Sequence, residues 1–423
     1  MLLLKILREH KEEIIQLHTI KNFDSRPLIE NIIALDDDRK KFQKEFDDLK
    51  AEQNQLAKQI GDLMKTGKKD SAELLKNRVA ELKEQSKSID EKLAQIETDI
   101  RELIVKIPNI PSEKVPLGKT PEDNLVVYKN HTDLPELPAT ALPHWDLASK
   151  YDLIDFELGV KITGAGFPVY KNKCARLQRA LINFFLDRAT AAGYIEMQPP
   201  ILINEDSGFG TGQLPDKEGQ MYYVTEDKYY LIPTAEVPVT NIYREVIVKP
   251  EELPIKMTAY TPCFRREAGS YGKDVRGLNR LHQFDKVEIV QLQHPDKSWE
   301  TLEEMRHYVA GLLQELELPF RTLLLCGGDM SFASSMTYDM EVYSAAQKRW
   351  LEVSSVSNFQ SFQAIRLNCR MKEEGAMKYV HTLNGSALAL PRIVAALLEN
   401  NQTPEGILIP KVLVPYTGFE MIS

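Results

Sequence analysis

The first group of residues able to do chemistry is Phe264-Arg265-Arg266-Glu267, at the start of a basic stretch. Residues 256–286 hold seven lysines and arginines against three acidic residues. Guanidinium groups bind phosphate oxygens through paired hydrogen bonds, and an aromatic ring offers a face for a nucleobase. The segment therefore predicts two strands joined by a long basic loop that binds a nucleotide triphosphate, whereas a surface hairpin with ordinary salt bridges is the alternative. Three glycines permit sharp turns in this loop: Gly269, Gly272 and Gly277.

A second group follows an apolar strand and reads Pro233-Thr234-Ala235-Glu236. A hydroxyl and a carboxylate two residues apart at a strand end can hold a small polar ligand. Thr234 could instead cap the next helix with Glu236 in its first turn, and the local pattern favours this capping interpretation.

The third group runs from Thr382 through Asn384, Gly385 and Ser386 to Arg392. Asn, Gly and Ser are predicted to open a helix that carries Arg392 on its second turn, where a guanidinium could face a bound polyanion. Ordinary helix capping beside an exposed arginine is the alternative.

Residues 28–107 predict two long helices that pair as a coiled coil. Apolar residues recur every seven positions in two series, Leu28, Leu35, Phe42, Leu49, Leu56 and Leu63, then Leu75, Leu82, Ile89, Ile96 and Leu103. Apolar residues four positions later complete both seams, with interruptions at Arg39, Gln53 and Ser86. Spacings that alternate between four and three are typical of a coiled-coil seam.

The turn between these helices is predicted within residues 64–70. Gly67 can end the first helix, and Asp70 with Glu73 predicts a capping box for the second. At about 1.5 Å per residue, each helix reaches roughly 50–55 Å, so the arm is expected to project. Start signals for the first helix are Asp24, Ser25 and Pro27.

The tip of the arm is basic. Residues 58–78 hold six lysines and arginines against three acidic residues, among them Lys65, Lys68 and Lys69. A basic rod end could bind a phosphate backbone. A dimerisation coiled coil or a spacer with solvated charges is the alternative.

Overall composition excludes several classes of protein. The 423 residues carry a net charge of −9, which argues against a general non-specific nucleic-acid binder. No apolar run approaches the length of a membrane span or a secretory signal. The four cysteines have no metal or redox spacing, so free thiols in a reducing cytoplasm are expected: Cys174, Cys263, Cys326 and Cys369.

A proline-rich linker separates the arm from a mixed α and β body. Pro108, Pro111, Pro116 and Pro121 end the second helix. Helices are predicted near 174–192, 234–247, 298–317 and 386–400, and short strands at 195–198, 221–224, 229–232, 287–290 and 350–353. Neither a GxGxxG sequence nor a glycine-rich phosphate loop after a strand is present, so a Rossmann or P-loop site is not expected.

The order of these segments resembles the class II aminoacyl-tRNA synthetases, and within them the seryl-tRNA synthetase family. Gly193 to Pro200 is similar to motif 1, residues 264–267 to motif 2, and Gly385 to Arg392 to motif 3. Segments similar to stretches specific to the seryl enzymes are Thr234-Ala235-Glu236, Glu352-Val353-Ser354-Ser355 and Thr382-Leu383-Asn384-Gly385-Ser386. Cys174 and Pro391 stand where the family often has glycine, and a proline kinks a helix unless it lies in the first turn.

The resemblance implies an α+β fold in two domains. Residues 1–107 would form a tRNA-binding domain with a helical hairpin at about 28–103, an antiparallel two-helix coiled-coil arm. Residues 108–423 would form the catalytic domain, an antiparallel sheet of six to seven strands flanked by helices. A homodimer through the motif 1 region would be the working unit.

The resemblance also implies which residues bind ATP. Arg265 would bind the α-phosphate and the serine carboxylate, and Glu267 would accept from the adenine amino group. Phe284 would stack on one face of adenine and Arg392 would cover the other face and reach the γ-phosphate. Arg280 would reach the outer phosphates. Further ATP-binding residues would be Arg266, Glu352, Val353, Ser354 and Ser355.

For the remaining ligands, the resemblance implies a metal and an amino-acid pocket. Glu352 and Ser355 would hold Mg²⁺ against the phosphates, and Glu288 would pair with the substrate ammonium group. Besides Arg265 and Glu288, the serine-binding residues would be Thr234, Ala235, Glu236, Thr382, Asn384 and Ser386. A polar pocket suits serine, because groups that must hydrogen-bond a hydroxyl reject alanine.

The implied activity is ATP-dependent activation of L-serine to seryl-adenylate, followed by transfer of serine to the 3′ end of tRNA(Ser). Charging of a selenocysteine tRNA is left open. Two rival hypotheses remain at this point. One is a synthetase-like enzyme that loads an amino acid onto a carrier protein, and the other is a catalytically inactive paralogue that acts through its coiled coil.

Overall fold

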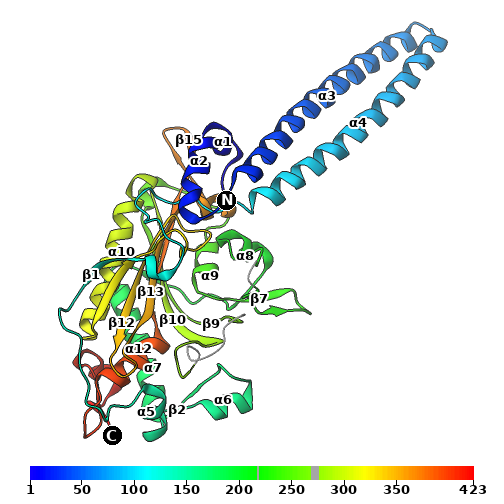
Figure 1. Ribbon diagram of the computed structural model, residues 1–423. Helices are drawn as coiled ribbons and strands as arrows, with labels where there is room; N and C mark the ends of the chain where they lie inside the picture. Colours follow the sequence, from blue (N-terminus) through cyan, green and yellow to red (C-terminus); the bar gives the residue numbers. More distant parts are fainter. Residues whose placement is uncertain (217–218, 268–275) are drawn as a thin grey trace. The chain divides into compact units, whose positions relative to one another are not determined.

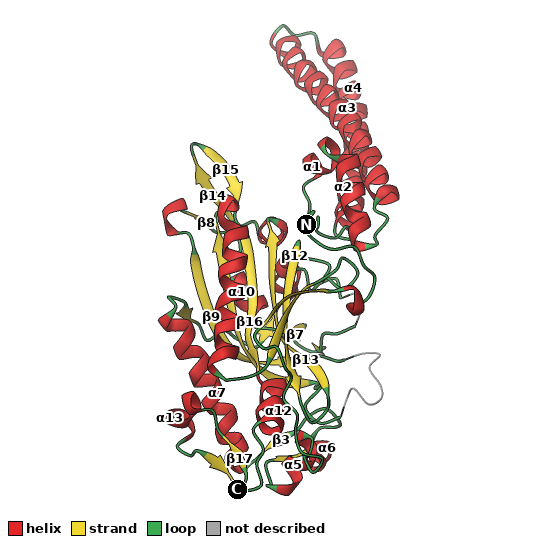
Figure 2. Cartoon of the chain, turned by 60° about the vertical axis from the view of Figure 1, so that its left-hand side comes forward, coloured by secondary structure: helices red, strands yellow, loops and turns green. Residues whose placement is uncertain are grey.

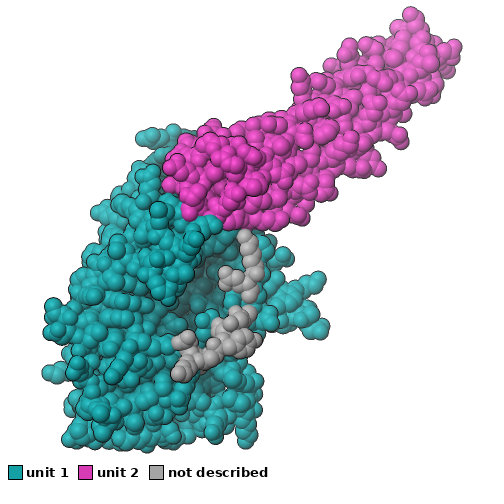
Figure 3. Space-filling model, viewed as in Figure 1, with its two compact units in different colours: residues 1, 20–22, 109–423 teal, residues 2–19, 23–108 magenta. Residues whose placement is uncertain are grey.

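The computed structural model describes residues 1–216, 219–267 and 276–423, so Gly269 and Gly272 of the basic loop lie outside the described residues. The chain divides into two compact units (Figure 3). One consists of residues 2–19 and 23–108, here called the arm unit. The other consists of residues 1, 20–22 and 109–423, here called the body unit.

The arm unit is helical. It contains α1 (Leu4–Glu9), α2 (Lys11–His18), α3 (Arg26–Lys65) and α4 (Lys69–Ile104). Helices α3 and α4 run antiparallel as a hairpin (Figure 1), as the heptad pattern predicts. Pro27 lies in the first turn of α3, and Gly67 adopts a left-handed φ of 75° in the tight connection. The predicted capping box is wrong, because α4 begins at Lys69 and Asp70 already lies within its first turn.

Two of the three interruptions in the heptad pattern pair with each other. The Gln53 side chain donates to the hydroxyl of Ser86 at 2.6 Å and to the carbonyl of Leu82 at 2.9 Å. Both side chains are buried, and the Ser86 hydroxyl also donates to the Leu82 carbonyl at 2.8 Å, so the three groups form one hydrogen-bonded cluster. A polar pair at one level of a coiled coil disfavours slipped registers, since slippage would bury the Gln53 amide away from both of its partners on α4. The third interruption, Arg39, pairs with the buried carboxylate of Asp36 at 2.8 Å.

The body unit is built on a mixed sheet of eight strands (Figure 2). Seven strands pair antiparallel, and β4 adds to the edge parallel to β9, so the sheet is wider than the predicted six to seven strands. In spatial order the strands are β1 (Leu125–Lys129), β11 (Phe320–Leu324), β12 (Met336–Ser344), β13 (Arg349–Gln360), β16 (His381–Ala389), β10 (Gln283–Gln293), β9 (Ile255–Phe264) and β4 (Ile195–Glu196).

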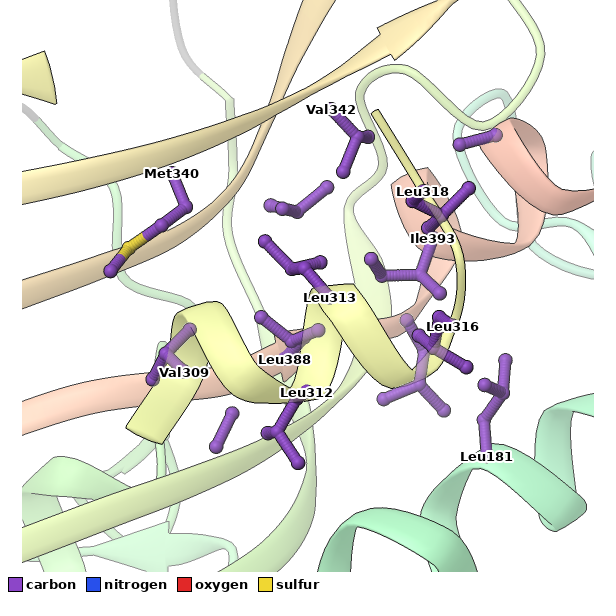
Figure 4. Packing of buried hydrophobic residues seen from close by; sticks show 14 of the residues in the cluster. Leu181, Val309, Leu312, Leu313, Leu316, Leu318, Met340, Val342, Leu388 and Ile393 are labelled. Carbon is purple, nitrogen blue, oxygen red and sulfur yellow. The ribbon is translucent and has the colours of Figure 1, made fainter. Parts of the chain in front are cut away.

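Alternation along β10 gives its two sides different characters around residues 286–289, whereas further along Val290 and Leu292 share the side of Glu288 and pack in a second apolar cluster. On β10, Val287 and Ile289 point into the main hydrophobic core, whereas Lys286 and Glu288 point to the opposite side. Helices cover the apolar face, and Figure 4 shows Leu312 and Leu313 of α10 packed near Leu388 and Ile393. These helices are α7 (Asn172–Ala191), α10 (Ser298–Glu315) and α12 (Leu390–Asn400).

Shorter elements complete the body unit. The helices are α5 (His144–Lys150), α6 (Phe156–Ile162), α8 (Glu205–Thr211), α9 (Glu236–Asn241), α11 (Phe362–Leu367) and α13 (Val414–Thr417). The small sheets contain β2 (Ile154–Asp155) with β3 (Val169–Tyr170), β5 (Leu202–Ile203) with β7 (Tyr229–Leu231) and β6 (Tyr223–Val224), β8 (Ile247–Val248) with β14 (Arg370–Glu373) and β15 (Ala376–Tyr379), and β17 (Ile407–Leu408) with β18 (Met421–Ile422).

Two of the predicted helices differ from the structure. The helix predicted near 234–247 is only the six residues of α9. The segment from Thr382 to Ser386 belongs to strand β16 rather than to a helix start, because it pairs with both β10 and β13. Among the described residues, helices of the length and apolarity needed to cross a bilayer are absent.

We predict that the Gln53–Ser86 pair stabilises the hairpin only as a pair. Gln53→Leu should lower the stability of α3 and α4 by about 0.5–1.5 kcal/mol, because the buried Ser86 hydroxyl and the Leu82 carbonyl each lose the hydrogen bond that they accept from Gln53. Adding Ser86→Ala should restore most of the loss, since both members are then apolar. Native-state hydrogen exchange of the α3 and α4 amides in the full chain measures this. A double variant no more protected than the single one would contradict the prediction.

Candidate active site

The polar face of the sheet brings together residues that are distant in sequence. Residues directly opposite in an antiparallel pair share a face, and so do alternate residues of one strand. Following the register from β10 through β16 and β13 to β12 places these polar residues on one face: Glu288, Ser386, Asn384, Ser357, Ser355 and Asp339.

A buried hydrogen-bonded cluster surrounds Glu288, whose side chain is 2% exposed. Lys286 forms an ion pair with the Glu288 carboxylate, and its ammonium group also donates to the Thr234 hydroxyl at 2.9 Å. The Thr234 hydroxyl donates to Glu288 Oε2 at 3.1 Å and accepts from the backbone N–H of Glu236 at 3.2 Å. Thr234 therefore contacts both Glu288 and the backbone at the start of α9, although Ala235 and not Thr234 is the N-cap residue of this helix.

The same cluster continues through Gln363 on α11. Its side-chain amide donates to Glu236 Oε1 at 2.6 Å, and its carbonyl accepts from the Thr382 hydroxyl at 2.6 Å. Thr382, Asn384 and Ser386 are all buried on β16. The predicted pocket residues Thr234, Glu236, Glu288 and Thr382 are thus brought together, while Ala235 is buried in the apolar cluster beneath α9.

Burial and the charge of Glu288 raise the pKa of Glu236 from 4.5 to about 7. Hydrogen bonds from Gln363 and Asn384 and the charge of Lys286 act in the opposite direction and lower it. Glu236 is therefore a carboxyl group that changes its protonation state near neutral pH, inside a lining of fixed hydrogen-bonding groups.

Arg265 lies where β9 ends, beside this cluster. Its guanidinium carbon is 5.2 Å from the centroid of the Phe284 ring, and its Nε donates to the carbonyl of Pro233 at 3.4 Å. The backbone N–H of Arg265 donates to His282 at 2.9 Å, which holds it to the strand entering β10. Arg266 is fixed through its backbone, which donates to the carbonyl of Gln220 at 2.8 Å.

Glu267 and Arg280 form an ion pair across the base of the basic loop. The Glu267 carboxylate is mostly shielded, with 13% of the side chain exposed, and the Arg280 side chain is 41% exposed. Glu267 also has a left-handed φ of 50°, which is uncommon for a residue with a side chain.

Arg392 lies in the first turn of α12, not the second as predicted, because β16 continues to Ala389. Pro391 occupies the same turn, where a missing N–H has no helical partner to lose. The Arg392 guanidinium donates to two carbonyls, to Asn279 through Nε at 3.0 Å and to Glu352 at 2.7 Å. Arg265 and Arg392 are therefore both held by backbone carbonyls, Arg265 by Pro233 before α9 and Arg392 by Asn279 at the end of the basic loop and by Glu352.

The four residues 352–355 divide between the two faces of the sheet. Glu352 is half-exposed, and its carboxylate lies 3.8 Å from Arg392. Val353 is buried in the main core, and the Ser354 hydroxyl donates to the carbonyl of Ser386 at 2.6 Å. Ser355 lies opposite Asp339 on the polar face.

Comparisons with known proteins show the family of this chain. Residues 1–111 match the seryl-tRNA synthetase N-terminal domain, and residues 222–401 match the class II tRNA synthetase core domain (G, H, P, S and T). A serine--tRNA ligase of Salinibacter ruber is 48% identical over 406 residues, 95% of each chain. This chain belongs to the seryl-tRNA synthetase family. The family and the fold class predicted from sequence are confirmed.

Solved structures of family members extend over the whole chain. The seryl-tRNA synthetase of Pyrococcus horikoshii, complexed with ATP, is 31% identical with a TM-score of 0.93, covering 100% of this chain and 99% of its own. The cytoplasmic serine-tRNA ligase of Naegleria fowleri, in complex with AMP, is 26% identical with a TM-score of 0.89 and the same coverage.

A second relative found by sequence is a serine--tRNA ligase of Chlorobium luteolum, which is 44% identical over 100% of this chain.

Three polar residues of this candidate site were not predicted from the sequence. Lys286 stands two positions before Glu288 on the same strand, so strand alternation could have found it. Gln363 lies on a short helix with no local signal. Asp339 is buried and is recognised only from the β12–β13 register; burial and the charge of Glu352 raise its pKa well above the ordinary value.

The predicted basic tip lies in the arm unit. Lys65 ends α3, Lys68 precedes α4 and Lys69 begins it, and all three side chains are exposed.

We predict that Glu236 makes the stability of the chain fall with rising pH. Its folded pKa of about 7 lies above the ordinary 4.5, so the folded state holds this proton more tightly than the unfolded state. The stabilising contribution is complete below pH 4.5 and is lost between about pH 4.5 and 7. Glu236→Gln cannot ionise, and its stability relative to the native chain should rise over this range.

Urea unfolding at pH 5, 6, 7 and 8 measures the difference, and the exposed Glu226→Gln is the matched control. Parallel pH dependence of the Glu236→Gln variant and the native chain would contradict the assignment.

Proposed function

We propose that this chain activates L-serine with ATP to seryl-adenylate and transfers the seryl group to the 3′ end of tRNA(Ser). The observation that carries the proposal is the buried polar lining around Glu288, Thr234 and Glu236 next to Arg265. The similarity to serine--tRNA ligases over the full chain supports the same conclusion. Neither the carrier-protein ligase nor the inactive paralogue is favoured.

The first step joins the serine carboxylate to the α-phosphorus of ATP, and pyrophosphate leaves. We assign Arg265 to the α-phosphate and the serine carboxylate, since its guanidinium is fixed at the edge of the lining by Phe284 and Pro233. A positioned cation stabilises the charge that develops in the transition state and also aligns the two substrates. Such a step needs no nucleophile from the protein.

Selection of serine follows from the polarity of the lining. Glu288 would bind the ammonium group, and Thr234, Glu236, Thr382, Asn384 and Ser386 would surround the hydroxymethyl group. Alanine would leave buried donors and acceptors of this lining unpaired, which costs far more than the lost apolar contact. Bulk must exclude threonine, because it also carries a hydroxyl.

ATP would lie along the basic loop and the start of α12. We assign adenine to the space between Phe284 and Arg392, its amino group to Glu267, and the outer phosphates to Arg280 and Arg392. Arg266, Val353 and Ser354 complete the proposed ATP contacts, Val353 through its backbone since its side chain is in the core. Separate roles for Glu267 and Arg280 require that their ion pair opens when ATP binds.

Mg²⁺ fits the strand pair β12–β13. The site offers the hard oxygen ligands that this ion prefers, from Glu352 and Ser355. Asp339 lies opposite Ser355, and its buried Oδ1 lacks a hydrogen-bond partner among the described residues, which suits a nearby cation. When bound, the ion would neutralise phosphate charge during the transfer.

The proposed division of labour follows the two sequence domains. Residues 1–107 would bind tRNA through the arm, and residues 108–423 would catalyse both steps. We propose a homodimer through the motif 1 region, where the Ile195 side chain is 59% exposed on an edge strand. A cytoplasmic location suits the four cysteines, all free and buried.

The deciding experiment is amino-acid-dependent ATP–pyrophosphate exchange with each of the twenty amino acids, followed by charging of tRNA(Ser) and tRNA(Sec) transcripts. Exchange with serine alone and charging of tRNA(Ser) are expected. Exchange without tRNA charging would favour the carrier-protein ligase, and absence of exchange would favour the inactive paralogue.

Arg265→Ala should lose about 2–4 kcal/mol of transition-state stabilisation, the loss typical of removing one charge-stabilising donor. The kcat/KM for serine-dependent exchange measures this. Arg179→Ala, on the exposed side of α7, removes the same charge away from the site and should leave exchange unchanged. Near-normal exchange in Arg265→Ala would contradict the assigned role.

Replacing the tip lysines Lys65, Lys68 and Lys69 by glutamine should weaken tRNA binding and flatten its salt dependence, because fewer counterions are released. The slope of log K against log[salt] should fall by about 0.7–0.9 for each lost phosphate contact. Matched removal of the exposed Lys41, Lys44 and Lys83 elsewhere on the arm tests whether the contact lies at the tip. Equal slopes in the two triple variants would mean that the phosphate contact does not lie at the tip of the arm.

A further inference from the structure

A histidine and a glutamate form a fully buried pair behind the proposed ATP site. His144 begins α5, Glu399 lies near the end of α12, and both side chains are 0% exposed. The carboxylate Oε1 accepts from the ring Nδ1 at 2.6 Å and from the backbone N–H of His144 at 2.9 Å. Charged groups are rarely buried this completely unless each hydrogen bond is satisfied.

The protonation of the ring follows from its second contact. The backbone N–H of Leu278 donates to His144 Nε2 at 2.8 Å, and an amide N–H can only donate. Nε2 is therefore the acceptor, and the ring proton is on Nδ1, directed at Glu399. One imidazole thus connects a backbone amide at the end of the basic loop to a carboxylate on α12.

The carboxylate is linked to the same stretch of chain a second time. Gln347 donates to Glu399 Oε1 at 2.9 Å, and the Asn279 side chain donates to Gln347 Oε1 at 3.1 Å. The Ser344 hydroxyl hydrogen-bonds the other carboxylate oxygen. Leu278 and Asn279 are therefore both tied to Glu399, one through His144 and the other through Gln347.

Close packing leaves this stretch little freedom. A Cβ atom at Gly277 would lie 2.2 Å from His144 Nε2, so the ring rests directly against the loop backbone. Gly277 has a φ of 68°, a left-handed conformation that glycine adopts without strain.

Arg392 is the group that this arrangement positions. Its Nε donates to the carbonyl of Asn279 at 3.0 Å, and it stands about two turns before Glu399 on α12. Helix α12 therefore carries Arg392 near its start and Glu399 near its end. Glu399 holds Asn279 in place through Gln347, and Asn279 supplies the carbonyl that Arg392 contacts.

We propose that His144 and Glu399 are positioning residues that hold residues 277–279 against α12 and thereby aim Arg392 at the outer phosphates of ATP. The inference rests on the role of Arg392 in the proposed function. A displacement of about 1 Å at a group that orients a reactant can cost roughly a hundredfold in rate. Charge-assisted hydrogen bonds of this kind are short and directional, which suits them to fixing a geometry.

Two substitutions at His144 separate positioning from folding. In His144→Asn, the side-chain amide can take the place of Nδ1–H and donate to Glu399, but the acceptor for the Leu278 N–H is lost. In His144→Gln, the side-chain carbonyl can take the place of Nε2 and accept from Leu278, but Glu399 loses its ring donor. The first variant keeps the buried carboxylate satisfied, and the second keeps the loop anchored.

We expect His144→Asn to raise the KM for ATP about tenfold or more in serine-dependent exchange, with the KM for serine within twofold and an unfolding temperature near that of the native chain. We expect His144→Gln to lower the unfolding temperature clearly and to raise the KM for ATP much less. Equal KM values for ATP in the two variants, or an equal rise in the KM for serine, would overturn the proposal.

A third variant covers the case in which either substitution prevents folding. Gln347→Ala removes only the second link to Asn279, on a partly exposed loop, and leaves His144 and Glu399 paired. The KM for ATP should rise about two- to threefold with serine again unaffected, and an unchanged KM for ATP would refute the second link.

Calorimetric titration with ATP in the absence of serine separates this inference from the proposed function. If the native chain binds ATP but shows no exchange with serine, the proposed function fails, and the ATP affinities of the variants still test the positioning. If the native chain exchanges serine normally and all three variants bind ATP as tightly as it does, the positioning inference alone fails.

Discussion

The buried carboxylate of Glu288 is the constraint on which the site depends. An ionised carboxylate removed from water is costly unless it is paired and hydrogen-bonded, and Glu288 has both Lys286 and Thr234 as partners. Those partners belong to β10 and to the segment before α9, so the charge links two parts of the body unit. The hydrogen bonds that pair the Glu288 carboxylate therefore also hold the surrounding polar lining in place.

The sheet allows this arrangement because its two faces have different tasks. Val287 and Ile289 secure β10 to the core under α7, α10 and α12, while Lys286 and Glu288 are free to face the opposite side. The antiparallel register then brings residues of β16, β13 and β12 to that side. A shift of one residue in any of these strands would move its polar side chains into the core.

Buried polar pairs recur in both units wherever segments must meet in one alignment. Gln53 with Ser86 fixes one level of the α3–α4 hairpin, and His144 with Glu399 ties the loop end to α12. In each case a different alignment would break hydrogen bonds between buried groups, so alternative alignments are penalised. Apolar packing alone would tolerate such slips more easily.

The sequence by itself determined the parts of this protein that depend on local pattern. The heptads define α3 and α4 because side chains four and three residues apart meet on one helix face, and the order of the motifs is enough to recognise the family. Even the interruptions at Gln53 and Ser86 were visible, although their contact was not.

The tertiary structure decided what depends on pairing across the chain. Thr382 to Ser386 form a strand because β10 and β13 lie on either side, which no local signal conveys. Glu399 gains its side-chain partners only when segments more than fifty residues away arrive beside it, and Gln363 meets Glu236 across 127 residues of sequence. The physical reason is that burial and strand register are set by the whole fold, whereas helix periodicity is set by neighbours in sequence.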